Sequence, residues 1–187
     1  MGMPMPRTDW TVEMLSELPD DGNRYEVIDG ELFVTPAPSH VHQRAVLQLL
    51  VLLDPYVKKL RLDLLLAPSA VTFSRQREVQ PDVLVLPPMS DGRPAVRFAD
   101  VGVLLLAVEV LSPYTKRTDR REKLALYQDE AVRAYWIVDT DARTIERWTP
   151  TSLHGEVFAD EMQWQPLDSY EPFVLDVAAY FRAVFWE

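Results

Sequence analysis

The sequence has 187 residues and contains no cysteine, so disulfides, thiolate nucleophiles and cysteine-ligated zinc are all excluded. It also lacks a long hydrophobic run. The longest apolar segments, 62–67 and 101–108, fall well short of the roughly 20 residues that span a bilayer. The N-terminal segment 1–7 has no apolar stretch of the kind that forms a signal peptide. Together these absences predict a soluble, cytoplasmic protein without a membrane partner.

Basic residues are scarce relative to acidic ones. Lys and Arg number 19 against 29 Asp and Glu, which gives a formal net charge of −10. This balance argues against a protein that coats nucleic acid by bulk charge, because phosphate binding needs neutralising cations. It is still compatible with a local basic patch, or with a carboxylate site that reaches phosphate through a metal ion. The length and the 48% hydrophobic content predict one domain over residues 1–187.

The spacing of apolar residues predicts three substantial helices. One covers about 41–59, where Pro55 is expected to kink the helix or end it early. A second is expected to begin at Asp119, because Glu122 stands three residues later, as in a capping box. The last follows Asp176, and its apolar face is expected either to pack on the core or to form a dimer interface.

The remaining segments predict a short first helix, capped by Thr8 or Asp9, and a set of strands. The pair Asp29-Gly30 predicts an N-terminal hairpin, because a tight turn needs residues that accept positive φ angles. Apolar runs predict further strands at 62–67, 70–73, 83–86, 103–110, 134–138 and 144–148. The order of elements predicts a mixed α/β (α+β) domain in which a central mixed β-sheet is flanked by helices.

Two carboxylates stand out by their position. Asp82 directly precedes one apolar strand, and Glu109 closes another. A carboxylate in such a strand is costly unless it is paired or binds a cation, and two on neighbouring strands would suit Mg²⁺ or Mn²⁺. Lys123, on the following helix, could point back across the strand end. The alternative is that Asp82 is a turn residue and that Lys123 is a solvated side chain, paired with Asp119 one helical turn earlier.

Several motifs occur in the order of a known family. They are 25–32, 36–44, 80–83, 108–113, 119–123 followed by Tyr127, and 135–139. This set resembles the Uma-type restriction-endonuclease family, within the PD-(D/E)XK nuclease superfamily. The resemblance implies a restriction-endonuclease-like fold. One departure is the segment 131–136, Ala-Val-Arg-Ala-Tyr-Trp, where the family commonly has Gly-Val-x-Glu-Tyr-Trp.

The same resemblance implies a role for individual residues. Asp82 and Glu109 would be the metal ligands, and the backbone carbonyl of Val110 would complete the metal shell. The superfamily pattern has its catalytic lysine two residues after the second acid, but Leu111 stands there in this sequence. Lys123 is then a migrated catalytic lysine, a variation that the superfamily is known to contain.

Further residues take accessory roles in this interpretation. His42 matches the family's histidine on the long helix, and Glu26 matches an acid of the hairpin. The densest basic cluster is the candidate for contact with nucleic acid, and it comprises Lys116, Arg117, Arg120 and Arg121. Because nucleases that cut duplexes often pair with two-fold symmetry, a homodimer is also expected.

Three hypotheses about function remain open. The first, which we favour, is a Mg²⁺- or Mn²⁺-dependent endonuclease acting on nucleic acid, with DNA as the expected substrate. In it, Lys123 offsets the charge that develops on the phosphate. The second is a non-catalytic binding or assembly module on the nuclease fold, which the net charge of −10 supports. The third is a carboxylate–metal enzyme that acts on a smaller phosphate ester.

Overall fold

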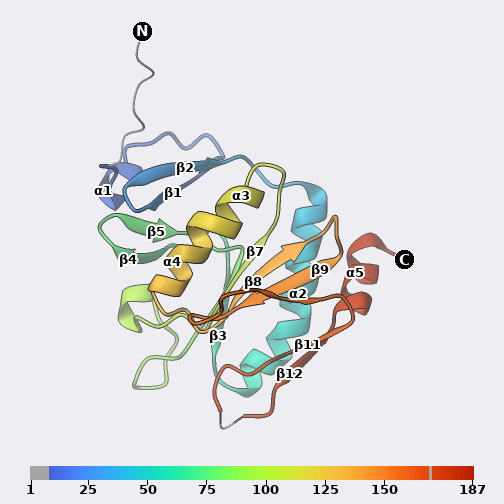
Figure 1. Ribbon diagram of the computed structural model, residues 1–187. Helices are drawn as coiled ribbons and strands as arrows, with labels where there is room; N and C mark the ends of the chain where they lie inside the picture. Colours follow the sequence, from blue (N-terminus) through green and yellow to red (C-terminus); the bar gives the residue numbers. More distant parts are fainter. Residues whose placement is uncertain (1–8, 169) are drawn as a thin grey trace.

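A six-stranded mixed sheet forms the centre of the chain in the computed structural model, which describes residues 9–168 and 170–187 (Figure 1). Its strand order is β10-β9-β8-β7-β6-β3. The strands are β3 (Asp63–Leu66), β6 (Val83–Leu86), β7 (Leu106–Val110), β8 (Tyr135–Asp139), β9 (Thr144–Trp148) and β10 (Glu156–Phe158). Only β7 and β8 pair in parallel, and the segment between them crosses the face of the sheet. This confirms the predicted mixed sheet.

A second sheet of four strands adjoins the first, in the order β2-β1-β5-β4. Its strands are β1 (Arg24–Ile28), β2 (Glu31–Thr35), β4 (Val71–Ser74) and β5 (Arg77–Val79). The hairpin between β1 and β2 turns at Asp29 and Gly30, whose φ angles are +50° and +80°. The predicted hairpin is therefore confirmed. A small third sheet pairs β11 (Glu161–Trp164) with β12 (Phe173–Asp176).

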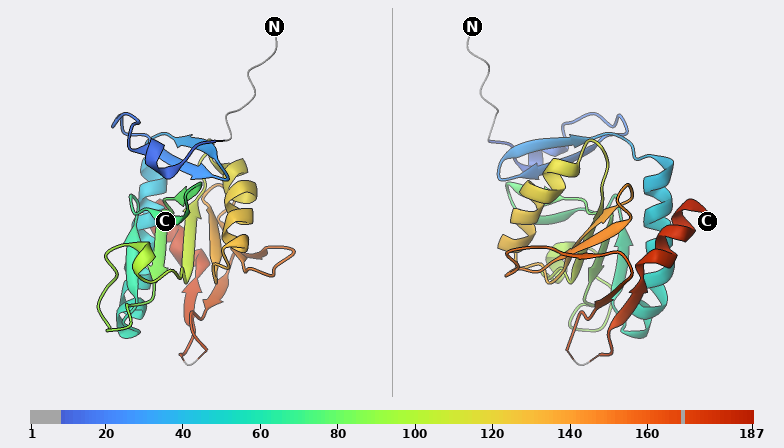
Figure 2. Two further views of the ribbon diagram at one scale, coloured as in Figure 1. Left: turned by 90° about the vertical axis from the view of Figure 1, so that its left-hand side faces the viewer. Right: turned by 45° about the vertical axis from the view of Figure 1, so that its right-hand side comes forward.

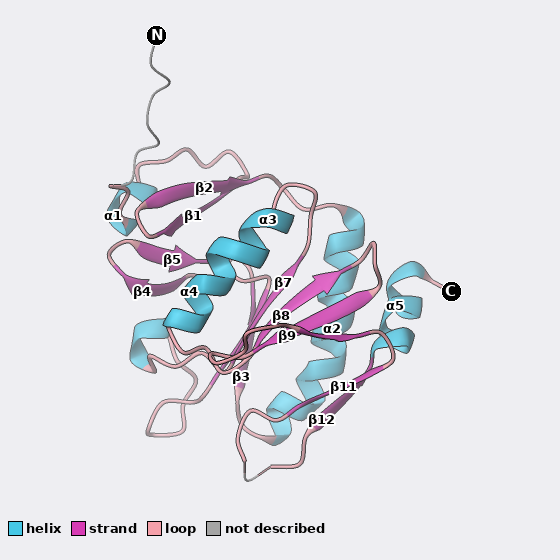
Figure 3. Ribbon diagram, viewed as in Figure 1, coloured by secondary structure: helices cyan, strands magenta, loops and turns pink. Residues whose placement is uncertain are grey.

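Helices cover both faces of the six-stranded sheet (Figures 2 and 3). One face carries α2 (His40–Lys59) and α5 (Val177–Phe185). The other carries a continuous helical segment formed by α3 (Lys116–Thr118), the π-helical turn η2 (Asp119–Lys123) and α4 (Leu124–Asp129). Two short helices are α1 (Val12–Leu15) and η1 (Phe98–Asp100).

The alternation of side chains along each strand explains the two faces. On β6, Val83 and Val85 pack in the core beneath α2 and α5, whereas Leu84 and Leu86 join the core beneath α4. Successive side chains of a strand point to opposite faces, so the apolar residues of β6 and β7 serve both cores. Glu109 follows the same alternation and faces the side of η2 and α4.

Several helix boundaries differ from those predicted. Of the two expectations for Pro55, a kink or an early end of the helix, the early end was wrong, because α2 continues to Lys59. The first helix is shorter than expected and begins after Thr11; Thr8 lies outside the described residues. Asp119 was predicted as a helix cap, but it lies inside the helical segment, where its own N–H donates to the Thr115 carbonyl at 2.9 Å.

Helix α5 packs on α2, which decides between the two alternatives for its apolar face. Val177, Phe181 and Val184 are buried in the core, and the Tyr180 hydroxyl donates to the Ala45 carbonyl at 2.9 Å. The apolar face of α5 is therefore not available as a dimer interface, and the homodimer stays a prediction. Over residues 9–168 and 170–187, no helix combines the length and the apolar character needed to traverse a lipid bilayer.

Candidate functional site

Four carboxylates and one lysine are buried together where the two larger sheets meet. Glu26 comes from β1, Asp82 from the residue before β6, Glu109 from β7, and Asp119 and Lys123 from η2. None of these side chains is more than 3% exposed. The predicted trio of Asp82, Glu109 and Lys123 is therefore brought together, with Glu26 beside it. The alternative of a solvated Lys123 was wrong.

Lys123 lies at the centre of an acidic cluster. Its Nζ lies 2.9 Å from Glu26 Oε2, 2.9 Å from Glu109 Oε1 and 3.9 Å from Asp119 Oδ1. Glu109 Oε1 also accepts a hydrogen bond of 3.2 Å from the Tyr127 hydroxyl. Both oxygens of Asp119 are buried, and neither has a hydrogen-bond partner within the described part of the chain. The lysine thus compensates only part of the negative charge around it.

Asp82 is held by three donors from three different elements. Its Oδ1 accepts from Arg24 Nη2 at 2.8 Å, and its Oδ2 accepts from His42 Nε2 at 2.9 Å and from the Val110 N–H at 2.8 Å. The Gln80 backbone holds the side chains of Arg24 and Glu26 in place. Its carbonyl accepts from Arg24 Nη1 at 2.7 Å, and its N–H donates to Glu26 Oε1 at 2.7 Å. The predicted accessory residues His42 and Glu26 are therefore both part of the cluster.

Charge and burial perturb the acids in opposite directions. Burial would raise the pKa of Asp82, but the hydrogen bond from His42 and the charges of His42 and Arg24 lower it to about 2. Burial raises the pKa of Glu109 well above its usual value, and Lys123 offsets this only in part. Burial likewise raises the pKa of Asp119 to about 6. Asp82 is thus ionised at neutral pH. Because an ionised carboxylate can only accept hydrogen bonds, His42 must carry a proton on Nε2 to bond to it.

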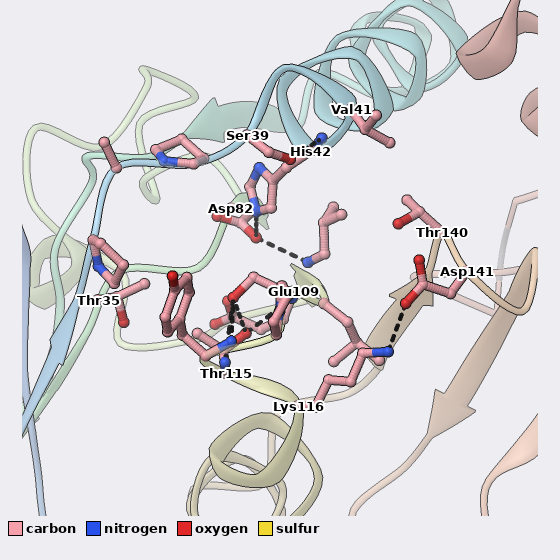
Figure 4. A pocket seen from close by; sticks show the side chains of 18 of the residues that line it. Thr35, Ser39, Val41, His42, Asp82, Glu109, Thr115, Lys116, Thr140 and Asp141 are labelled. Atoms are coloured by element: carbon pink, nitrogen blue, oxygen red, sulfur yellow. Dashed lines mark hydrogen bonds and ion pairs between the residues drawn. The ribbon is translucent and has the colours of Figure 1, made fainter.

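A cavity of about 450 Å³ opens onto this cluster (Figure 4). Asp82 and Glu109 lie at its base, and the start of α2 contributes Ser39 and His42. The far wall carries Lys116, whose Nζ is 2.7 Å from Asp141 Oδ2. A second cavity of about 370 Å³ lies on the other side of Arg24, His42 and Asp82. The volumes are those of clefts that bind small molecules.

The predicted basic cluster is split by ion pairs. Lys116 is engaged by Asp141, and Arg120 lies between Asp139 and Glu146. Arg117 and Arg121 are exposed, but neither lines the cavity. Of the four residues predicted to contact nucleic acid, only Lys116 lies at the cavity, and its charge is already paired.

Sequence reasoning missed two members of the site. Arg24 was not singled out, because a charged residue at the start of a strand is ordinarily solvated, and its partner Asp82 is 58 residues away. Asp119 was interpreted only as a cap or an exposed pair. The signal that could have identified it is its spacing of one helical turn from Lys123, once that lysine was assigned to a buried site.

The donors in the cluster suit a hard cation by their chemistry, since Mg²⁺ and Mn²⁺ prefer carboxylate and carbonyl oxygens. Asp82 and Glu109 line the same cavity. The Val110 N–H points toward Asp82, and in an extended strand the carbonyl of the same residue faces the same side. Within residues 9–168 and 170–187, however, no three Asp, Glu or His side chains converge as a preformed ligand set. A cation would compete with Arg24, His42 and Lys123 for the carboxylate oxygens.

The model of the Uma2 family, putative restriction endonucleases, matches residues 12–178. The chain belongs to the Uma2 family. The matched range contains every member of the buried cluster, from Arg24 to Lys123. Membership supports a nuclease function in general terms and confirms the resemblance that the motifs indicated.

A solved structure shows the same fold. A crystal structure of a putative nuclease belonging to DUF820 from Anabaena variabilis matches this Uma2 chain with a TM-score of 0.76 and 21% identity. The match covers 94% of this chain and 99% of the other. It confirms the predicted restriction-endonuclease-like fold. No curated protein matches the chain.

Proposed function

We propose that this Uma2 protein is a Mg²⁺- or Mn²⁺-dependent endonuclease, with Asp82 and Glu109 as metal ligands. The charge balance of the buried cluster carries the proposal. Four buried carboxylates face two permanent cations, Arg24 and Lys123, and the raised pKa values of Glu109 and Asp119 reflect an excess of acids that these cations do not fully compensate. A divalent cation would balance this excess. Bound there, it would supply positive charge to a phosphodiester oxygen and lower the pKa of a water molecule.

The residues of the chain have distinct tasks in this proposal. Lys123 keeps Glu109 in place through its 2.9 Å contact and adds positive charge at the base of the cavity, where a phosphate would accumulate negative charge. His42 and the Val110 N–H orient the Asp82 carboxylate. The Val110 carbonyl would be the backbone ligand. We further propose that the whole chain, residues 1–187, acts as one restriction-endonuclease-like domain on nucleic acid, with DNA as the expected substrate.

Cleavage assays with matched variants test the proposal. Wild-type protein is expected to cut single- or double-stranded DNA or RNA when Mn²⁺ or Mg²⁺ is present, and to be inactive in EDTA. Asp82→Asn and Glu109→Gln should abolish cleavage, whereas Glu161→Gln, at an exposed position on β11, should retain it. Cleavage that persists in both site variants would refute the assignment of these residues. Mn²⁺ density between the two carboxylates in a crystal would test the site independently of turnover.

A second candidate function has a specific observation in its favour. Both oxygens of Asp82 and one of Glu109 are already bonded to protein donors, as expected for a self-sufficient buried network. This arrangement favours a non-catalytic binding or assembly module that uses the ion pairs to hold its fold. Titration calorimetry distinguishes the two functions. An enzyme should bind Mn²⁺ and lose that binding in Asp82→Asn, whereas a module should bind none at millimolar concentration.

A further inference from the structure

Tyr114 is an exposed aromatic residue at the rim of the main cavity. It lies in the turn that directly follows β7, so it is only five residues beyond Glu109, and it lines the same cavity. Its side chain is 76% exposed. The buried tyrosines contrast with it, because Tyr127, Tyr135 and Tyr180 each use their hydroxyl in a hydrogen bond within the chain. Among the described residues, the Tyr114 ring stacks on no other aromatic ring, and its hydroxyl makes no hydrogen bond within the chain.

The backbone that carries Tyr114 is fixed. The Ser112 Oγ accepts from the N–H groups of Tyr114 at 3.3 Å and Thr115 at 3.2 Å. The Ser112 N–H donates in turn to Thr115 Oγ1 at 3.2 Å. The ring is thus presented from a hydrogen-bonded turn, and Pro36 and Pro113 line the same cavity. A ring on a hydrogen-bonded backbone has only its own two side-chain torsions to order when a flat ligand stacks on it.

The charges at the cavity argue against a ligand held mainly by phosphate contacts. Its permanent cations are Arg24, Lys116 and Lys123, and each is engaged by a carboxylate of the chain. Duplex DNA presents one charge per ~1.7 Å of axis, about twice the density of one of its strands. A surface of net charge −10 with paired cations therefore penalises a duplex more than a single strand. Stacking supplies affinity that does not depend on charge.

The depth of the two carboxylates in the cavity also favours a single strand over a duplex. Asp82 and Glu109 are each 3% exposed, at the base of a cavity of about 450 Å³. A stiff duplex lying across the opening would keep its phosphates away from both acids. A single strand can bend, insert one nucleotide and bring the adjoining phosphodiester to the base of the cavity.

We propose that the substrate of this site is single-stranded nucleic acid, and that Tyr114 holds it by stacking on an unpaired base. Tyr114 is then a specificity-determining residue that selects a strand over a duplex, without reading its sequence. The proposal rests on the proposed function, because the phosphodiester next to the stacked base is the one that would meet Asp82 and Glu109.

Fluorescence anisotropy tests the proposal through binding alone. The probes are a fluorescein-labelled thymidine oligomer as DNA, the matching uridine oligomer as RNA, and the blunt duplex of the DNA strand, in EDTA and in Ca²⁺. Wild type is expected to bind the strands more tightly than the duplex. Tyr114→Ala should weaken strand binding about 5- to 150-fold, from the stacking energy of one base, while Tyr114→Phe keeps it. Leu153→Ala is the control, since Leu153 is 88% exposed and does not line the cavity.

Two further readouts separate stacking from a structural effect. The fluorescent base analogue aminopurine, placed in the strand, should be quenched by wild type and by Tyr114→Phe but not by Tyr114→Ala. The salt dependence should be shallow, with a slope of about −0.7 to −1.4, because the proposal has only one or two phosphates contacted. Duplex binding as tight as strand binding, strand binding unchanged in Tyr114→Ala, or no binding to any probe would each overturn the proposal.

The outcomes distinguish this inference from the proposed function. If metal-dependent cleavage is lost in Glu109→Gln but Tyr114→Ala changes neither binding nor the preferred substrate, the endonuclease stands and the strand-selecting role of Tyr114 is refuted. If binding depends on Tyr114 but no metal supports cleavage, strand recognition stands and the endonuclease fails. The relative affinities of the thymidine and uridine oligomers decide between DNA and RNA.

Discussion

Replacing Lys123 by methionine is the sharpest single perturbation of this molecule. Methionine matches the length of the aliphatic stem but removes the ammonium group that lies 2.9 Å from both Glu26 and Glu109. Removing one partner of a buried ion pair typically costs about 3–5 kcal/mol, because the remaining charge is left without compensation. For a chain of this length, that loss lowers Tm by about 6–20 °C.

The same substitution should introduce a pH dependence of known sign. Burial raises the pKa of Glu109 well above its usual value and that of Asp119 to about 6, and in both cases Lys123 opposes the rise. Without Lys123 both pKa values increase further in the folded state. A group with a raised pKa stabilises the fold below its unfolded pKa and loses that contribution as pH rises through its folded pKa. Lys123→Met should therefore lose least stability near pH 5 and most near pH 8.

Urea unfolding of both proteins at pH 5 and pH 8, in EDTA, measures this effect. Lys58→Met is the matched control, because its Nζ pairs with Asp54 on the exposed side of α2 and its side chain is 75% exposed. That control should shift Tm by about 2 °C or less at either pH. Equal behaviour of Lys123→Met and Lys58→Met, or a loss in Lys123→Met that grows as pH falls, would refute the charge balance derived for the cluster.

Three further predictions concern other parts of the site and the core. His42 and Arg24 lower the pKa of Asp82 from 3.8 to about 2, so wild type should lose about 2 kcal/mol as pH falls from 4 to 2, and acid titration of Asp82→Asn should lack this step. Arg24→Gln frees Asp82 Oδ1 from a competing cation and should tighten Mn²⁺ binding several-fold by calorimetry; weaker binding would contradict that competition. Gly155→Ala places a Cβ 2.6 Å from the Trp148 ring and should cost about 1–3 kcal/mol, whereas unchanged thermal unfolding would show that the ring can move.

The elements that could be predicted from sequence are those with a strong local signal. The Asp29-Gly30 turn and the long apolar period of α2 are both local, and both are confirmed. Strands β5 and β10 are three residues each, too short for an alternating pattern to emerge above their polar neighbours. The π-helical turn gave no signal either, because its register is set by packing against the sheets and not by local composition.

The site was predictable to the extent that charge conflicts with an apolar pattern. Glu109 is an acid inside an apolar strand, so the sequence pattern alone identified it as a candidate site residue. Lys123 was a candidate from its place on the helix that follows this strand, but a lysine on a helix is ordinarily solvated. The resemblance to a family was therefore needed to prefer the site over a solvated side chain. Arg24 and Asp119 lie in segments that are compatible with exposure. Only contacts between distant parts of the chain bury Asp119 and leave Arg24 half-buried.

The π-helical turn η2 limits how the chain can change in length. Asp119 and Lys123 stand at its two ends, and one extra residue separates them from regular α-helical geometry. Deleting Arg121 would remove that extra residue and leave a regular α-helix. Asp119 would then stand three residues before Lys123 instead of four, so the spacing that the turn sets between these two buried side chains would change. Insertions and deletions should accumulate in the loop 87–94, whereas the count of residues between Glu109 and Lys123 should be held constant.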